Sequence, residues 1–187
     1  MSVEEAIARR RSVRRYGRQS LSLPHLSQVL WAAQGLTAPG RLRAAPSAGA
    51  TYPLEVFVLI GRDGVEGLDP GMYRYNVKTH SLEPHKGGDL REELSIAALD
   101  QEFIAQAPVD IVICALYERT SRRYGRRAER YVHMEVGHVG ENIHLQAAAL
   151  GLAVVMVGAF EDEPVRELMD LAEEVKPLYI IPVGKPR

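Results

Sequence analysis

The chain has 187 residues, of which 46% are hydrophobic and 25% are charged, and its formal net charge is −1. This balance argues against a dedicated nucleic-acid-binding protein, which usually carries a basic excess. No apolar run approaches the roughly 18 residues of a membrane span, and the basic N-terminus lacks the apolar core of a secretory signal. Cys114 is the only cysteine, which suits a reducing compartment. We expect one cytoplasmic domain over residues 1–187 that binds neither nucleic acid nor a membrane.

Apolar spacing predicts two helices at the start of the chain, over residues 3–11 and 23–34. Ser2 and Glu5 have the spacing of a capping box for the first helix, and Pro24 suits the first turn of the second. A loop rich in Pro, Gly and Ala, a buried strand and a hairpin are predicted next, over residues 37–53, 54–61 and 71–88.

The second half of the chain contains the longest predicted helix, over residues 128–150. Its apolar stripe consists of Val132, Val136, Val139, Ile143 and Leu150. Gly137 and Gly140 lie on another side, where they would allow a second backbone to approach. The other predicted elements are a helix over 89–107, a strand over 109–117, a basic segment over 118–131 that is a helix start or a mobile excursion, a strand within 151–160, a helix over 161–171 and a strand over 177–184. Helices and strands mix without strict alternation, which favours an α+β fold.

The segment RRRSVRR, residues 9–15, places five arginines around one serine. A nucleic-acid arm, a solvated helix end and a cradle for one phosphate are the three interpretations. Side chains two residues apart lie on the same side of an extended chain, so Arg10, Ser12 and Arg14 would line up there. Guanidinium groups and a hydroxyl are suitable phosphate donors, whereas cations at a helix C-terminus also balance its dipole. Composition alone leaves the solvated surface and the cradle open.

Two further segments are rich in small residues. PSAGATYP, residues 46–53, would let a flat ligand approach its backbone, and Ser47 adds a hydroxyl. VMVGAF, residues 155–160, ends a predicted strand at Gly158 and offers a similar approach. A plain surface loop and a plain turn are the alternatives.

Two copies of the spacing E-x-x-H occur in the long predicted helix, at Glu135–His138 and Glu141–His144. Di-iron bundles use this spacing, but they draw the two copies from different helices. Here the copies lie six residues apart on one helix, which turns the second by about 240° around the axis. They cannot converge, so we expect no metal site.

Seven segments, in chain order, resemble the FMN-dependent nitroreductase superfamily, and most closely its SagB-type branch of azoline dehydrogenases. They are ARRRSVRRY, LWAAQGL, APSAGATYPLEVFVL, GMYRYN, RYGRRAERYVHMEVGHVGENIHLQAAALGL, VGAF and PLYIIPVGKP. The resemblance implies a central, mostly antiparallel sheet flanked by helices. It also implies an intertwined homodimer with FMN at the subunit interface.

The resemblance further implies which residues hold FMN. In the family, an R-x-S-x-R motif grips the phosphate, and basic residues near the C-terminus complete that site. A Pro-Ser loop covers the flavin from the partner subunit, and a turn after the long helix brings backbone N–H groups near flavin N5. The phosphate would then be held by Arg10, Arg11, Ser12 and Arg14, with Lys185 and Arg187 as the basic residues near the C-terminus. The Pro-Ser loop corresponds to Pro46, Ser47, Ala48 and Gly49, and the turn near flavin N5 corresponds to Met156, Val157 and Gly158.

The activity implied is a ping-pong reaction, in which NAD(P)H delivers hydride to flavin N5 and a small nitro or quinone acceptor then takes the electrons. Two alternatives stay open: a SagB-type azoline dehydrogenase acting on a modified peptide, and a non-catalytic flavin redox sensor. Azoline dehydrogenases share a Lys-Tyr pair, which Arg123 and Tyr124 match here. Because arginine is a poor base, the resemblance leaves Tyr124 as the candidate catalytic residue for substrate protonation or contact.

Overall fold

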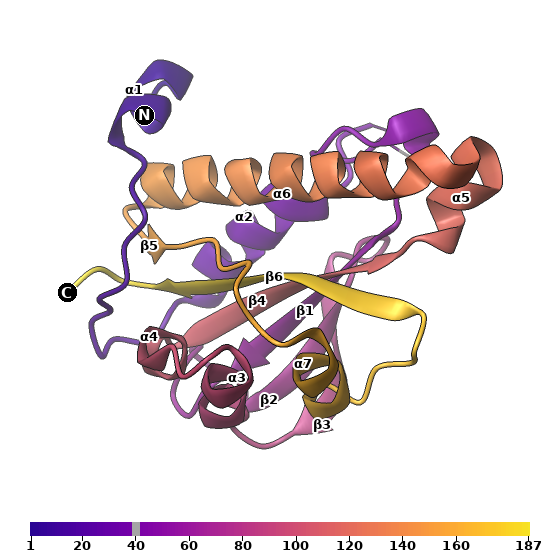
Figure 1. Ribbon diagram of the computed structural model, residues 1–187. Coiled ribbons are helices and arrows are strands. Elements are labelled where there is room, and N and C mark those ends of the chain that lie inside the picture. The colour runs from indigo at the N-terminus through magenta and orange to yellow at the C-terminus, as the bar shows by residue number, and fades with distance from the viewer. Residues whose placement is uncertain (39–41) are drawn as a thin grey trace.

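The computed structural model of the protein describes residues 1–38 and 42–187 (Figure 1). A six-stranded sheet lies at its centre, with the strand order β3-β2-β1-β4-β6-β5, and all neighbouring strands pair antiparallel. The strands are β1 (Leu54–Ile60), β2 (Gly71–Asn76), β3 (Ser81–Gly87), β4 (Val109–Leu116), β5 (Ala153–Val154) and β6 (Val175–Gly184). The predicted α+β fold with an antiparallel sheet is confirmed.

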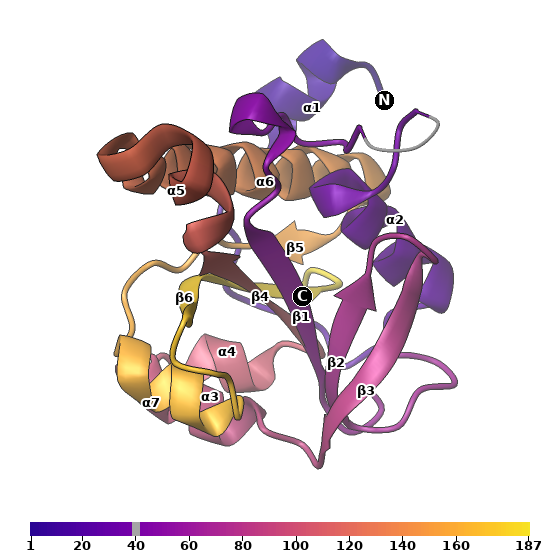
Figure 2. The ribbon, with the colours of Figure 1, turned by 90° about the vertical axis from the view of Figure 1, so that its right-hand side faces the viewer.

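Helices cover both faces of this sheet. They are α1 (Val3–Arg9), α2 (Leu23–Gln34), α3 (Arg91–Ala97), α4 (Glu102–Gln106), α5 (Glu118–Tyr124), α6 (Ala128–Leu150) and α7 (Asp162–Leu168). Helices α2 and α6 lie on one face, and α3, α4 and α7 lie on the other (Figures 1 and 2). In β1, Val56 and Val58 join the core under α2 and α6, whereas Phe57 and Leu59 join the second core. A strand buried on both faces explains the continuous apolar run in its sequence.

Helix α6 follows its predicted bounds, and its stripe of Val132, Val136, Val139 and Ile143 is buried against the sheet. Its glycines differ in their surroundings. A Cβ on Gly140 would lie 3.2 Å from the Tyr179 ring, so this glycine makes room for a side chain of its own chain. Gly137 faces open space. The expectation that both glycines serve a second backbone is therefore corrected for Gly140.

Two predicted elements differ from the structure, and for a third the structure shows the helical one of its two alternatives. The helix over 89–107 is divided into α3 and α4, because Leu99 and Asp100 adopt positive φ angles of 60° and 56° that end a helix. Only β5 is regular strand within 151–160, since regular pairing ends at Val154 and the chain meets β6 again only through an isolated bridge between Val157 and Ile180. The basic segment 118–131 forms α5 and the short turn η2 (Gly125–Arg127), which lead directly into α6.

The N-terminal helix begins as predicted, since Ser2 Oγ accepts from Glu5 N–H and Glu5 Oε2 accepts from Ser2 N–H. Its apolar residues remain largely exposed, however: Val3 is 66% and Ile7 is 55% accessible. Trp31 of α2 is also exposed, beside a cavity of about 340 Å³ between α1, α2 and α6. Among the described helices, none combines the length and the hydropathy that a bilayer crossing requires.

Candidate active site

Residues 10–17 run as an extended segment along the sheet edge beside β5 (Figure 1). Ser12 forms a parallel bridge with Val154, and Val13 N–H donates to the Val154 carbonyl over 2.9 Å. Val13 packs inward, whereas Ser12 and Arg14 are exposed and Arg10 is half-buried. Because side chains alternate along an extended chain, Arg10, Ser12 and Arg14 leave the backbone on the same outward side. We call these three residues the cradle. The Arg14 guanidinium lies over the Phe103 ring of α4, 5.6 Å from its centre.

Helix α6 holds this segment in place. Buried His144 lies with Nε2 3.0 Å from the Arg11 carbonyl, and since a carbonyl only accepts, Nε2 carries the proton. Arg10 Nε lies 3.8 Å from Glu141 Oε1. The Arg11 guanidinium turns back to donate to the carbonyls of Ala8 and Arg10, over 3.0 and 2.7 Å. The charge of Arg11 therefore lies at the C-terminal end of α1.

The C-terminal residues run antiparallel to the same segment. Gly17 N–H donates to the Lys185 carbonyl over 2.9 Å, and Arg187 N–H donates to the Arg15 carbonyl over 3.3 Å. The structure thus brings Lys185 and Arg187 alongside residues 15–17, next to the Arg14 end of the cradle.

The turn predicted to face flavin N5 follows β5 directly, so it lies beside the cradle. Val157 is buried, and its N–H donates to the Ile180 carbonyl over 2.9 Å. Within the described part of the chain, the N–H groups of Met156 and Gly158 have no hydrogen-bond acceptor. Gly158 is exposed, and an added Cβ would make only an ordinary 3.5 Å contact with Tyr179. Two backbone donors are therefore available here, and the third is occupied by β6.

The Pro-Ser loop, residues 46–49, lies away from the cradle, above the half of α6 that adjoins α5 (Figures 1 and 2). Gly49 and two following residues, Ala50 and Tyr52, have positive φ angles of 58°, 51° and 46°. Ser47 Oγ accepts from the Tyr52 N–H over 3.0 Å, which closes the turn. The loop is thus a tightly curved segment held by its own hydroxyl.

Helix α5 contacts this loop. Arg123 Nη1 donates to the Gly49 carbonyl over 3.2 Å, and a Cβ on Gly49 would lie 2.5 Å from the Tyr124 hydroxyl oxygen. The Tyr124 ring packs edge-on against Tyr131, with 5.0 Å between the ring centroids. Tyr124 and the Pro-Ser loop therefore form one unit, although they are separated by about 75 residues in the sequence.

A buried carboxyl group lies under the Pro-Ser loop. Glu135 of α6 is 2% accessible, and among the described residues its Oε1 has no hydrogen-bond partner. Burial raises the pKa of Glu135 to about 7, although the Ser47 hydroxyl and the charge of Arg43 act in the opposite direction. The loop therefore rests on a group that changes its protonation near neutral pH.

The helix α6 residues that support both units were missed by our sequence analysis, which weighed Glu135, His138, Glu141 and His144 only as metal ligands. In the structure, His138 and His144 contact backbone carbonyls instead, those of Pro46 and Arg11. Within residues 1–38 and 42–187, no group of three or more His, Cys, Asp or Glu residues could hold a metal ion. A polar residue such as Glu135 inside the apolar stripe was the available signal.

The model of the Nitroreductase family matches residues 7–185. MJ1384 of Methanocaldococcus jannaschii, which is named as a candidate nitroreductase, is 47% identical over 185 residues, covering 99% of this chain and 91% of that protein. The microcin B17-processing protein McbC of Escherichia coli is 28% identical over 168 residues, covering 87% of this chain and 62% of McbC. The chain therefore spans about three-fifths of McbC.

Solved structures of similar fold agree with these sequence matches. The crystal structure of a candidate nitroreductase from Ralstonia eutropha has a TM-score of 0.85 and 29% identity, covering 100% of this chain and 84% of that chain. A chain of the E. coli microcin synthetase McbBCD complex, which carries bound truncated pro-MccB17, has a TM-score of 0.82 and 26% identity, with coverage of 100% and 73%.

Proposed function

Because the chain belongs to the nitroreductase family and is an oxidoreductase of that kind, we propose that it uses FMN to pass electrons from NAD(P)H to a small nitro or quinone compound. One observation carries the proposal. The cradle and the free N–H groups of Met156 and Gly158 lie along the same sheet edge, at either side of the Ser12–Val154 bridge. When bound, FMN would supply the hydride chemistry.

The donors at this edge suit the two ends of such a cofactor. Two guanidinium groups and a hydroxyl from Arg10, Ser12 and Arg14 match the oxygens of a phosphate, and the paired C-terminus adds Lys185 and Arg187. Backbone N–H groups of Met156 and Gly158 would donate to the ring. Fixed backbone donors stabilise negative charge on a ring without having to reorganise.

A homodimer is the second part of the proposal. The Pro-Ser loop lies at the other end of α6 from the cradle, so a loop that covers the flavin has to come from a partner chain (Figure 1). The exposed Val3, Ile7 and Trp31 supply apolar surface for that partner. Light scattering of the purified protein should give the mass of two chains, and Ile7→Arg should shift it toward one. A monomer in the unsubstituted protein would contradict the dimer.

The test is an absorbance spectrum of the purified protein, followed by anaerobic addition of NADH and then NADPH. Flavin bands that bleach within seconds of adding either nucleotide are the expected result. A protein that takes up no FMN even after reconstitution would overturn the assignment of the cradle. A flavin that binds but stays oxidised would overturn the nicotinamide step alone.

A SagB-type dehydrogenase is the second candidate function. The observation that favours it is the contact of Tyr124 with the Pro-Ser loop at Gly49, together with the similarity to McbC, which is named for microcin B17 processing. In that case Tyr124→Phe should abolish oxidation of an azoline peptide while NAD(P)H oxidation continues. Tyr131→Phe is a matched control, since this neighbouring ring loses the same hydroxyl. Equal loss of both activities in Tyr124→Phe would count against this function.

A further inference from the structure

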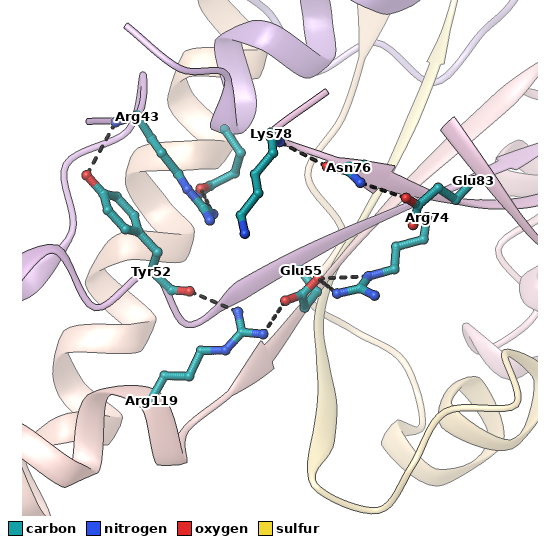
Figure 3. Close-up of polar contacts among 9 residues, drawn as sticks. Arg43, Tyr52, Glu55, Arg74, Asn76, Lys78, Glu83 and Arg119 are labelled. Atoms are coloured by element: carbon teal, nitrogen blue, oxygen red, sulfur yellow. Dashed lines mark hydrogen bonds and ion pairs between the residues drawn. The ribbon is translucent and has the colours of Figure 1, made fainter. Parts of the chain in front are cut away.

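A polar cavity of about 390 Å³ lies over β1 and β2, between α5 and the segment before the Pro-Ser loop (Figure 3). Its volume falls in the range of small-molecule sites, which is roughly 300–1,000 Å³. The ionisable residues that line it are Arg43, Glu55, Arg74, Lys78, Glu83 and Arg119. None of them belongs to the cradle or to the Met156–Gly158 turn.

Glu55 binds two of the four cations in this cavity. Arg74 donates to Glu55 Oε2 through Nε and Nη2, over 3.1 and 2.8 Å, and Arg119 forms an ion pair with Oε1 (Figure 3). The side chain of Glu55 is 12% accessible. One carboxylate thus fixes two guanidinium groups on the cavity floor, and together they retain one positive charge.

Within the part of the chain that the structure describes, neither of the other two cations forms an ion pair with a carboxylate, although Glu55 and Glu135 lie near enough to Arg43 to act on its charge. Arg43 Nη1 donates to the neutral Gln34 amide over 2.7 Å, and its guanidinium lies 4.5 Å from the centre of the Tyr52 ring. Burial lowers the pKa of Arg43, which reflects the cost of keeping its charge away from water. The Lys78 side chain points into the cavity (Figure 3), and no carboxylate among the described residues forms an ion pair with its Nζ.

Glu83 is the second carboxylate that lines the cavity, and its Oε1 accepts a hydrogen bond from the Asn76 side-chain amide over 2.6 Å. Four cations therefore face two carboxylates, an excess of two positive charges in a partly enclosed cavity. We propose that this cavity binds the phosphate group of a small molecule. A phosphate carries about two negative charges near pH 7 and accepts from donors that approach from several directions, as the Arg43, Lys78 and Arg119 side chains do here.

This site is connected to the Pro-Ser loop through Tyr52. Arg119 Nη1 donates to the Tyr52 carbonyl over 3.1 Å, and the Arg43 N–H donates to the Tyr52 hydroxyl over 3.3 Å. A phosphate bound by Arg43 and Arg119 would therefore affect the position of Tyr52, whose N–H closes the loop turn. A change in the spectrum of bound flavin would follow, and this consequence, unlike the binding itself, rests on the proposed function.

Calorimetric titration of the FMN-loaded protein with orthophosphate, at constant ionic strength, tests the site. FMN keeps the cradle occupied, so heat from added phosphate reports binding in the polar cavity over β1 and β2. Lys78→Gln is the main variant, because Lys78 is exposed and its loss leaves the core intact. We expect its Kd for phosphate to rise at least about tenfold, as for the loss of one charge-assisted hydrogen bond. Lys78→Arg should restore most of the affinity.

Arg122→Gln is the matched control, because it removes one exposed positive charge from α5 outside the cavity. Its Kd should change by less than about twofold, in keeping with a screened surface charge. A parallel titration with glycerol phosphate separates the two sources of the group: tighter binding than orthophosphate indicates a phosphate on a larger molecule, and equal binding indicates the free ion.

Three outcomes would overturn the proposal: no phosphate heat in the unsubstituted protein, an equal response to chloride, or equal losses in Lys78→Gln and Arg122→Gln. Failure of the proposed function is read separately, as the absence of a flavin spectrum. In that event the same titration in an Arg14→Gln background, which weakens phosphate binding at the cradle, still tests the polar cavity over β1 and β2.

Discussion

The cradle and the Pro-Ser loop are both expected to contact the same cofactor, yet they are held in different ways. The cradle is positioned by backbone pairing, through the Ser12–Val154 bridge and the Gly17 and Arg187 hydrogen bonds. Ser12 and Arg14 are exposed, and the side-chain contacts of the cradle are a loose ion pair of Arg10 with Glu141 and the stacking of Arg14 over Phe103. The Pro-Ser loop turns at Gly49 and is followed by two strained residues with positive φ angles, Ala50 and Tyr52, and it rests on side chains of distant elements.

The difference shows how each region can respond. Side chains on a paired edge can be exchanged with little effect on the fold, so substitutions in the cradle should affect ligand binding alone. The loop lies over Glu135, a buried carboxyl whose protonation changes near neutral pH, so substitutions there should alter stability and its pH dependence. These two expectations can be tested separately.

The largest expected effect is on FMN binding by the cradle. Ser12→Ala combined with Arg14→Gln removes a hydroxyl and a guanidinium, at a cost of about 3–4 kcal/mol in binding, or a few hundredfold in Kd. The melting temperature of the apoprotein should stay within a few degrees, since both side chains are exposed. Titration of flavin fluorescence measures the first and differential scanning fluorimetry the second.

Arg15→Gln is the control for charge, because Arg15 is also exposed but occupies the alternate position along the extended segment. It should change the Kd for FMN by less than about threefold, as expected for a screened charge without a direct contact. If Arg15→Gln weakens FMN as much as Arg14→Gln does, the outward alternation of the cradle is wrong.

The next effect concerns Glu135. Its pKa is raised from about 4.5 in the unfolded chain to about 7 in the folded protein, so between these values the folded state retains a proton that the unfolded state has lost. Stability from this group is present below pH 4.5 and is lost as the pH rises through 7, by about 3 kcal/mol in total. Glu135→Gln should remove that decline. Urea unfolding at several pH values measures it.

Glu141→Gln is the control on the same helix, because Glu141 is exposed and pairs only loosely with Arg10. The pH profile of this variant should follow that of the unsubstituted protein. Parallel profiles for Glu135→Gln and the unsubstituted protein would contradict the view that the loop rests on a buried, protonatable group.

The sequence predicted those parts of the molecule that depend on local pattern. The stripe of α6, the buried β1 and the alternation in the cradle each follow from a period of side chains along one segment. The cradle could be predicted because Arg10, Ser12 and Arg14 need only an extended backbone. The break between α3 and α4 was missed because apolar residues recur on both sides of it, up to Leu99 and again from Phe103. That spacing does not show that φ turns positive at Leu99 and Asp100.

The supports of the Pro-Ser loop could not be predicted in the same way. Contacts such as Arg123 to Gly49 and Arg119 to Tyr52 join residues more than 60 positions apart, and no period along the chain encodes them. Glu135 carried a signal, a carboxyl inside an apolar stripe, but its position under Ser47 emerges only once the loop is folded over α6. Local chemistry therefore indicated the cradle, whereas tertiary packing determined the loop.

The smallest expected effect is that of substituting Arg123. It distinguishes whether the Pro-Ser loop is held mainly by its packing over buried Glu135 or by its surface contact with α5. Arg123 is exposed, and its hydrogen bond to the Gly49 carbonyl is long, at 3.2 Å. Arg123→Ala should therefore lower the free energy of unfolding by less than about 1 kcal/mol, since water replaces the lost donor. Urea unfolding at pH 8 measures the change, with Arg122→Ala on the adjacent exposed position as control. A loss above about 2 kcal/mol would mean that α5 anchors the loop from the surface, and that burial over Glu135 is the lesser support.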